Sequence, residues 1–276
     1  MDKPTIRDQF AACVAQPDAD IALDVAALLI AAESEPDLDI KRYLRYLDTT
    51  AARFKADFDH STNSGASITS LNDFIYRTEG YSGNIKSYYE PRNSFLNHVI
   101  NTHQGIPITL ALIHICLGRR LQLPVHGISF PGHFLVRYGD DQPVIIDPFS
   151  GRVLSETDCS TLLKQIAGPS AVLQPEYLEV ATNKSILIRI LDNLKQIFWH
   201  NQAWDESKAC IERQLLLIPE RQEFNVQLGA VYERQGKLGL AQHTYTMILE
   251  DCLDPDIKLL ASQRLLAMGT SKPIIH

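Results

Sequence analysis

The feature that most constrains the fold of this chain is a change in the spacing of its apolar residues at Pro124. Before this proline, Ile108, Leu112 and Ile115 recur at helical spacing. Pro107 stands in the first turn of that helix, where proline is tolerated because the N–H that it lacks would have no partner. After Pro124 the apolar residues alternate with a period of two, which is typical of strands. The middle of the chain therefore predicts a helix followed by an antiparallel sheet, with short strands at residues 125–130, 133–138 and 144–147.

The segments on both sides of this region are helical. Residues 5–59 contain two or three amphipathic patterns, and a loop rich in Ser, Thr, Asn and Gly follows at residues 60–70. After about residue 175 the helical spacing returns. We therefore expect an α+β fold with three parts: an N-terminal helical cap at residues 1–60, a core of a helix and a small sheet at residues 61–175, and a helical region at residues 176–276.

An internal repeat runs through the C-terminal helical region. Four positions recur at a constant offset of 34 residues, namely Leu194 with Leu228, Phe198 with Tyr232, Ser207 with Ala241, and Ile211 with Tyr245. This offset is the period of tetratricopeptide helix pairs, although two unrelated helical hairpins in one register would give the same match. Since two copies are fewer than the roughly three that a solenoid needs, we expect them to pack on neighbouring helices or on the core, with a capping helix at residues 257–268.

Charge and composition argue against several kinds of binding partner for this protein. The formal net charge is −7, and residues 1–60 hold 12 acids against 7 bases, whereas nucleic-acid binding needs a concentrated basic face. The longest apolar run, residues 21–32, is interrupted by an aspartate and is shorter than the ~20 residues of a membrane span. The five cysteines form no C-x-x-C pair and have no histidine at metal-ligand spacing. We expect a cytoplasmic protein without a signal peptide and without a nucleic-acid, membrane, metal or cofactor partner.

His133 and Asp147 are the strongest candidates for catalytic residues in this sequence. If the turn between the last two strands is centred on Asp140, these residues lie opposite each other on one face, with Cβ atoms ~4.5–5.5 Å apart. A carboxylate at that distance orients an imidazole and raises its basicity, as in a nucleophile–His–Asp triad. A buried histidine that is satisfied by an aspartate at a strand end would produce the same spacing.

Three longer motifs surround this pair: Tyr-Glu-Pro-Arg-Asn-Ser-Phe-Leu-Asn at residues 89–97, Gly-Ile-Pro-Ile-Thr-Leu at 105–110 and Phe-Pro-Gly-His-Phe-Leu-Val-Arg at 130–137. With them the chain resembles the transglutaminase-like core of the papain-like superfamily. More closely, over nearly its whole length, it looks like the bacterial SirB-type proteins, which join such a domain to tetratricopeptide repeats. The resemblance implies a helix that a Gly-x-Cys motif opens, followed by the catalytic His and Asp on adjacent strands.

The resemblance does not supply a nucleophile. Pro107 stands where the cysteine of active relatives opens the helix, and proline has no nucleophilic atom. Cys116 lies nine residues further along, two and a half turns deeper and on the opposite face. Thr109 and Ser94 carry the nearest hydroxyls by sequence, but a threonine in a first helical turn more often bonds the backbone.

The residues that we expect to line a groove beside the His–Asp pair are Asn93, Asn97, Pro107 and Thr109. The two asparagines are spaced i and i+4, so they would offer amide donors to a bound carbonyl or else cap the loop that enters the helix. Three other histidines, His103, His114 and His126, lack ligand spacing and are expected to be surface or satisfied core residues.

Two functions follow as hypotheses. In the first, the chain is a transglutaminase-like domain without the catalytic cysteine that works as a protein- or peptide-binding regulatory scaffold through its repeats. In the second, His133 and Asp147 form a general-base dyad that drives hydrolysis or acyl transfer without a cysteine. The sequence leaves the substrate, the partner and the oligomeric state open.

Overall fold

The computed structural model describes residues 4–57, 70–140 and 143–270. Residues 60–69 of the expected loop and residues 141–142 of the expected turn lie outside this description. The chain divides into two compact units, residues 1–190 and residues 191–276, and each is described by itself. The expected α+β class is confirmed, since a small antiparallel sheet lies among helices and a run of packed helices follows it. No helix in the described ranges combines the length and apolar character that crossing a membrane requires.

Three helices open the first unit, as the sequence predicts. A capping box between Thr5 and Asp8 starts the first of them, with Thr5 Oγ1 accepting from the Asp8 N–H at 3.1 Å. The second is buried almost continuously from Ala26 to Ala32, which explains its long apolar run. These helices are α1 (Ile6–Val14), α2 (Leu23–Ser34) and α3 (Ile40–Asp57).

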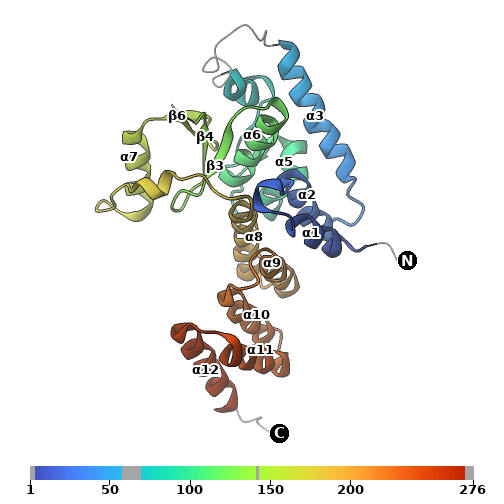
Figure 1. Ribbon diagram of the computed structural model, residues 1–276, viewed down its shortest axis with the longest axis vertical. Coiled ribbons are helices and arrows are strands. Elements are labelled where there is room, and N and C mark those ends of the chain that lie inside the picture. The colour runs from blue at the N-terminus through green and yellow to red at the C-terminus, as the bar shows by residue number, and fades with distance from the viewer. Residues whose placement is uncertain (1–3, 58–69, 141–142, 271–276) are drawn as a thin grey trace. The chain divides into compact units, whose positions relative to one another are not determined.

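The centre of the first unit is helix α6 (Pro107–Leu121), which the sequence predicted with Pro107 in the first turn. Every residue from Pro107 to Gly118 is buried. Helices α2, α3 and the short α5 (Leu96–Thr102) pack on it, and so do the first two strands of the main sheet (Figure 1). A helix that is buried on all sides is expected to carry apolar residues around its whole circumference. Helix α6 does so, except for the buried polar residues Thr109 and His114.

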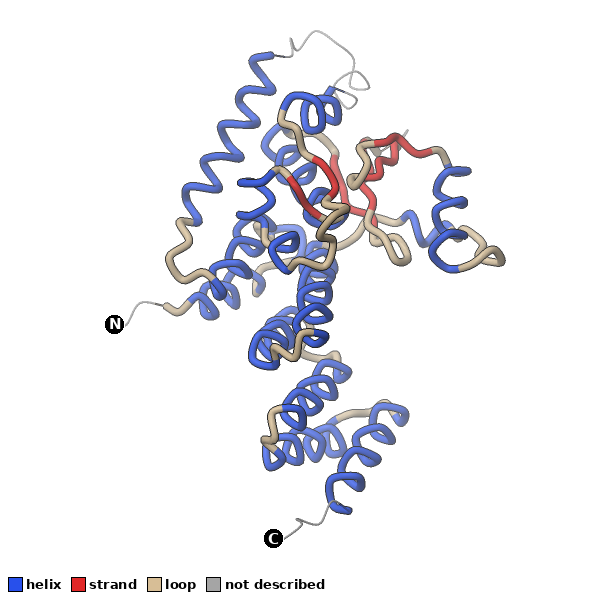
Figure 2. Tube along the Cα trace, turned by 180° about the vertical axis from the view of Figure 1, so that it is seen from behind, coloured by secondary structure: helices blue, strands red, loops and turns tan. Residues whose placement is uncertain are grey.

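The main sheet has four antiparallel strands in the order β3-β4-β5-β6 (Figure 2). Gly118 of α6 lies so close to β3 that a Cβ atom there would come within 2.5 Å of Val125 Cγ2. Helix α7 follows the last strand. The bounds are β3 (Val125–Ile128), β4 (Leu135–Tyr138), β5 (Val144–Asp147), β6 (Arg152–Leu154) and α7 (Glu156–Ala167), with a separate parallel pair β1 (Ser82–Gly83) and β2 (Gln104–Gly105).

The register of the central hairpin corrects the prediction. Val136 pairs with Ile146 and Tyr138 with Val144, so the turn is centred one residue later than Asp140. Continuing this register places Leu135 opposite Asp147, and the expected position of His133 directly across from Asp147 is wrong. His133 also precedes strand β4 instead of beginning it. A register shift of two positions preserves the alternation of faces, so the two side chains still approach each other.

The second unit is helical throughout its described part. Helix α8 crosses the division between the units, and four further helices follow. Helices α9 and α11 begin and end 34 residues apart, as their bounds show, and so do the last residues of α8 and α10. The bounds are α8 (Asn183–His200), α9 (Trp204–Leu217), α10 (Gln222–Arg234), α11 (Leu238–Asp251) and α12 (Pro255–Thr270).

Gly229 of α10 packs tightly against Tyr245 of α11. A Cβ atom at this position would stand 2.6 Å from Tyr245 Cε1. Tyr245 is fully buried and donates its hydroxyl to Glu233 Oε1 at 2.6 Å, so its ring is held in place. A glycine inside a helix costs about 0.5–1 kcal/mol relative to alanine, and here that cost is offset by the close packing that glycine permits.

Replacing this glycine tests the packing. Gly229→Ala should lower the free energy of unfolding of the second unit by about 1–2 kcal/mol, because overpacking by a methyl group exceeds the gain in helix propensity. Urea unfolding followed by tryptophan fluorescence measures this, because both tryptophans of the chain, Trp199 and Trp204, lie in the second unit. Gly239→Ala in α11 is the control, since nothing lies within 4 Å of the point that its methyl group would occupy and stability should be unchanged or higher. Equal unfolding midpoints for the two variants would contradict the prediction.

Candidate functional site

A tight turn places His133. The His133 N–H donates to the Phe130 carbonyl at 3.0 Å, with Pro131 and Gly132 at the two central positions. Gly132 has φ of +66°, so the turn needs glycine there and Pro131 presets the position before it, as in a type II turn. A side chain at Gly132 would also collide with Ile166 of α7. The local sequence therefore fixes the point from which the imidazole projects.

The expected bond between His133 and Asp147 is present, with Nε2 of the imidazole 2.8 Å from Oδ1 of the carboxylate. A charged carboxylate only accepts, so Nε2 carries a proton, and in the neutral form of the imidazole Nδ1 carries the lone pair. Nδ1 has no hydrogen-bond partner among the described residues, and 14 % of the His133 side chain is exposed. The imidazole is thus oriented with its basic nitrogen away from the aspartate.

Asp147 is held in its charged form by three donors. Besides His133, the Phe149 N–H donates to Oδ1 at 2.9 Å and the Ser150 hydroxyl donates to Oδ2 at 2.6 Å. Burial disfavours the carboxylate, but these hydrogen bonds and the nearby imidazole outweigh it and lower the pKa of Asp147 below its usual value of 3.8. The Phe149 and Ser150 bonds are local to the turn after β5, so they do not depend on His133.

A buried hydrogen-bond chain lies behind Asp147. Tyr76 donates to the Pro148 carbonyl at 2.6 Å, so its oxygen must accept from His114 Nε2 at 2.9 Å. His114 Nδ1 is then unprotonated and accepts from the Tyr138 hydroxyl at 2.5 Å. Burial lowers the pKa of His114 to about 3, so this histidine is neutral. His114 is therefore a satisfied core residue, as expected, and through Tyr76 it links α6 to the turn that follows Asp147.

Thr109 is committed to the backbone. Its hydroxyl donates to the Asn93 carbonyl at 2.7 Å and accepts from the Ile106 N–H at 3.2 Å, and the residue is fully buried. Pro107 is buried as the first residue of α6, with Ile106 as the preceding cap residue. Neither residue offers a nucleophile at this helix start.

The side chains of Asn93 and Asn97 also form hydrogen bonds within the protein. Asn93 donates to the Ser87 and Tyr88 carbonyls at 2.6 and 3.1 Å, and its oxygen accepts from Asn84 at 2.9 Å. Asn97 donates to Glu35 at 2.9 Å and is 1 % exposed. This burial is at odds with a role in lining a groove or binding a carbonyl. The Asn93 bonds fit the alternative of a residue that caps the loop, whereas Asn97 lies in α5 and bonds to Glu35 at the end of α2.

The cysteines supply no nucleophile at this site. All five are free thiols, and Cys116, at the deep side of α6, is 1 % exposed. Burial raises the pKa of the Cys116 thiol far above its usual value, which removes the thiolate that nucleophilic attack needs. Within the described ranges, His, Cys, Asp and Glu side chains do not gather in any group of three that could hold a metal ion.

Comparison with known proteins agrees with this architecture. A family model described as the transglutaminase-like superfamily matches residues 41–192. The chain belongs to this superfamily. It also belongs to the UPF0162 family, since a UPF0162 protein of Xylella fastidiosa is 34% identical over 238 residues, which are 84% of this chain and 85% of the relative.

Two further proteins show weaker similarity to this chain. F-box only protein 21 of Mus musculus is 28% identical over 182 residues, which cover 61% of this chain and 28% of that protein. A crystal structure of menin, described as revealing the binding site for Mixed Lineage Leukemia protein, aligns with 88% of this chain and 69% of the menin chain at a TM-score of 0.44 and 10% sequence identity.

The buried chain of hydrogen bonds should be sensitive to loss of one donor. Tyr138→Phe leaves His114 Nδ1 buried without a donor, so the free energy of unfolding of the first unit should fall by about 1–3 kcal/mol. Far-UV circular dichroism during urea unfolding measures the loss. Tyr89→Phe is the control, because Tyr89 is 79% exposed and should give no measurable change. Wild-type ¹⁵N shifts should report His114 as the Nε2–H tautomer, and a Nδ1–H tautomer would overturn the assignment.

Asp147 should give stability a pH dependence of known sign. Because its folded-state pKa lies below the unfolded value, the carboxylate stabilises the fold at pH above about 4 and loses this contribution as pH falls through the folded pKa. Asp147→Asn should therefore cost about 1–2 kcal/mol of unfolding free energy at pH 7 and a smaller amount at pH 3. Asp140→Asn, on the same hairpin and 72% exposed, should give a small difference at both values. A cost for Asp147→Asn that does not shrink at pH 3 would contradict the assignment.

Proposed function

We propose that this chain is a transglutaminase-like protein without covalent cysteine chemistry that acts as a protein- or peptide-binding regulatory scaffold of the SirB type. The observation that carries the proposal is Pro107 at the first position of α6. In active relatives the cysteine at this position gains thiolate character from the helix N-terminus and the imidazole, and proline gives those effects no atom to act on.

The surroundings of Pro107 support the proposal. The Thr109 hydroxyl bonds to the backbone, and Asn93 bonds to two backbone carbonyls and to the Asn84 side chain. Cys116 is buried, and burial raises the pKa of its thiol. The His133–Asp147 pair depends on the turn at Gly132 and on local donors from residues 149 and 150, so it can persist without a nucleophile. A fold can outlive its chemistry in this way.

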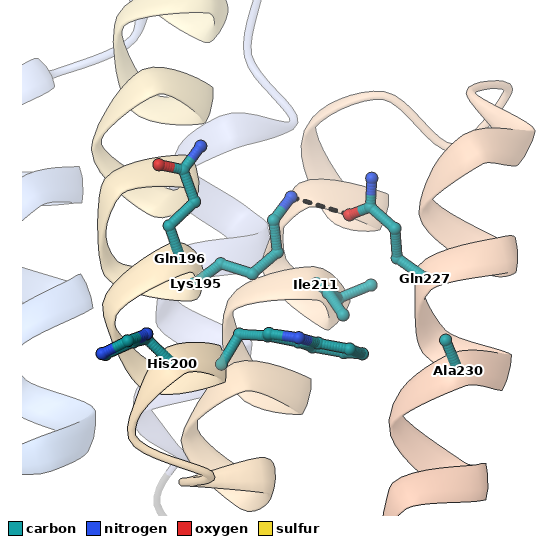
Figure 3. Close-up of a pocket in the computed structure, with 7 residues that line it drawn as sticks. Lys195, Gln196, His200, Ile211, Gln227 and Ala230 are labelled. Carbon is teal, nitrogen blue, oxygen red and sulfur yellow. Dashed lines mark hydrogen bonds between the residues drawn. The ribbon is translucent and has the colours of Figure 1, made fainter.

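The binding surface in this proposal belongs to the second unit, which we take to be tetratricopeptide-like. The 34-residue offset between its helices supports that interpretation. A pocket of about 430 Å³ lies between α8, α9 and α10, within the ~300–1,000 Å³ typical of ligand sites. Figure 3 shows Ile211 and Ala230 at its apolar wall and Gln196, Gln227 and His200 around it.

The proposal includes a cytoplasmic location. All five cysteines are free thiols. A reducing compartment is where such a set of thiols persists.

A second candidate function rests on one specific observation, the intact His133–Asp147 hydrogen bond. With its free lone pair on Nδ1, His133 would act as a general base that activates water or a substrate hydroxyl for hydrolysis or acyl transfer. No cysteine takes part in this reaction.

Peptide display on the full chain separates the two candidates. A scaffold should enrich peptides whose affinity falls about tenfold or more with Ala230→Glu, which puts a charge into the apolar pocket, and is unchanged with His133→Gln. Circular dichroism checks that both variants fold. Failure of the wild-type chain to enrich any peptide would refute the scaffold. Hydrolysis of activated esters or peptide amides that disappears with His133→Gln would instead establish the dyad enzyme.

A further inference from the structure

Arg234 is unusual among the cations of the second unit. It ends helix α10, is exposed, and its Cζ lies 5.9 Å from the centre of the Trp199 ring and 6.0 Å from that of Trp204. The two indoles meet edge to face with their centres 5.2 Å apart. No carboxylate among the described residues forms an ion pair with Arg234, whereas Arg264 of α12 is paired with Glu233 at 2.6 Å.

The contact with the indoles leaves the hydrogen bonds of the guanidinium free. The attraction of the cation to the π electrons of the rings uses no N–H donor, and the Arg234 guanidinium makes no hydrogen bond to another described residue. Its N–H donors form a rigid fork that matches a carboxylate with two parallel hydrogen bonds.

Two pockets meet at this place. The pocket beside Arg234 has a volume of about 450 Å³ and is lined by Trp199, His200, Gln202, Trp204 and Arg234. It shares Trp199 and His200 with the apolar pocket that Ile211 and Ala230 line. A free guanidinium therefore adjoins an apolar pocket, and one short segment of a ligand can reach both.

Lys195 does not compete for the same ligand, although it lines the apolar pocket. Its ammonium donates to Asp192 Oδ1 at 2.6 Å, Gln214 Oε1 at 2.9 Å and Gln227 Oε1 at 2.7 Å. All three of its donors are thus used inside the unit (Figure 3 shows the bond to Gln227). The available positive charge at the two pockets is that of Arg234.

We propose that these pockets bind a peptide segment in which an acidic side chain stands next to an apolar one. The carboxylate of an internal Asp or Glu bonds to the guanidinium of Arg234, and the neighbouring apolar side chain enters the pocket of Trp199, Ile211 and Ala230. This inference rests on the proposed scaffold function and names the chemistry of its partner.

The experiment uses the full chain and a library of peptides randomised between constant flanks, so that neither peptide terminus contributes a charge. The enriched sequences should pair Asp or Glu with Leu, Ile, Met or Phe. Their binding should change the tryptophan emission, because both tryptophans of the chain touch the site. Arg234→Gln should weaken the enriched peptides about tenfold or more, and replacing the peptide's acid by its amide should do the same.

Matched variants decide the inference. Arg221→Gln changes an arginine at the other end of α10 that lies 5.5 Å from the Phe224 ring, and it should leave the affinity unchanged. Arg234→Lys keeps the charge without the fork and should recover only part of the affinity. The inference is overturned if enriched peptides lack an acid, if they bind Arg234→Gln as tightly as wild type, or if phosphoserine in place of the acid raises the affinity tenfold. In each of these cases peptides still bind, so the scaffold function stands, whereas a wild-type chain that enriches no peptide refutes both.

Discussion

The burial of helix α6 on all sides is the constraint on which the first unit depends. A helix whose residues from Pro107 to Gly118 are all buried cannot face water, so the chain has to provide cover around its whole circumference. Helices α2, α3 and α5 give part of that cover and the sheet gives the rest. The close approach at Gly118 and Val125 then sets the distance between the helix and the first strand. The His133–Asp147 pair belongs to the sheet of this arrangement, since Asp147 ends β5 and His133 lies in the turn before β4.

The same arrangement explains how the His133–Asp147 pair coexists with a proline at the helix start. The imidazole is placed by the turn at Gly132, and the carboxylate by donors two and three residues after it. None of these contacts involves Pro107. The contacts that position the His133–Asp147 pair are therefore independent of the residue at the nucleophile position. A proline at that position leaves the pair hydrogen-bonded and the Asp147 charge paired.

How far the sequence predicts the structure depends on how local each interaction is. The period of the apolar residues identifies α6 and the strands, and the Pro-Gly pair explains the turn before His133. The predicted register of the β4–β5 hairpin differs from the observed one because the spacing of apolar residues in strands does not determine how many residues form the turn. The commitment of Asn93 to two carbonyls of the loop at residues 87–88 could not be predicted, because it requires the path of that loop. Likewise Arg234 meets the two tryptophans only through the packing of α8, α9 and α10.

The hydrogen-bond chain from Tyr138 through His114 and Tyr76 ends on the Pro148 carbonyl. A peptide carbonyl is too weakly basic to keep a proton, and the imidazole is neutral, so the order of donors and acceptors runs in one direction and cannot be reversed. The chain therefore conducts no charge between the sheet and the helix. Its three hydrogen bonds instead join Tyr138 in β4 to the carbonyl of Pro148, the residue after Asp147. The end of β5 that carries the carboxylate is therefore held by the buried core as well as by the turn that follows it.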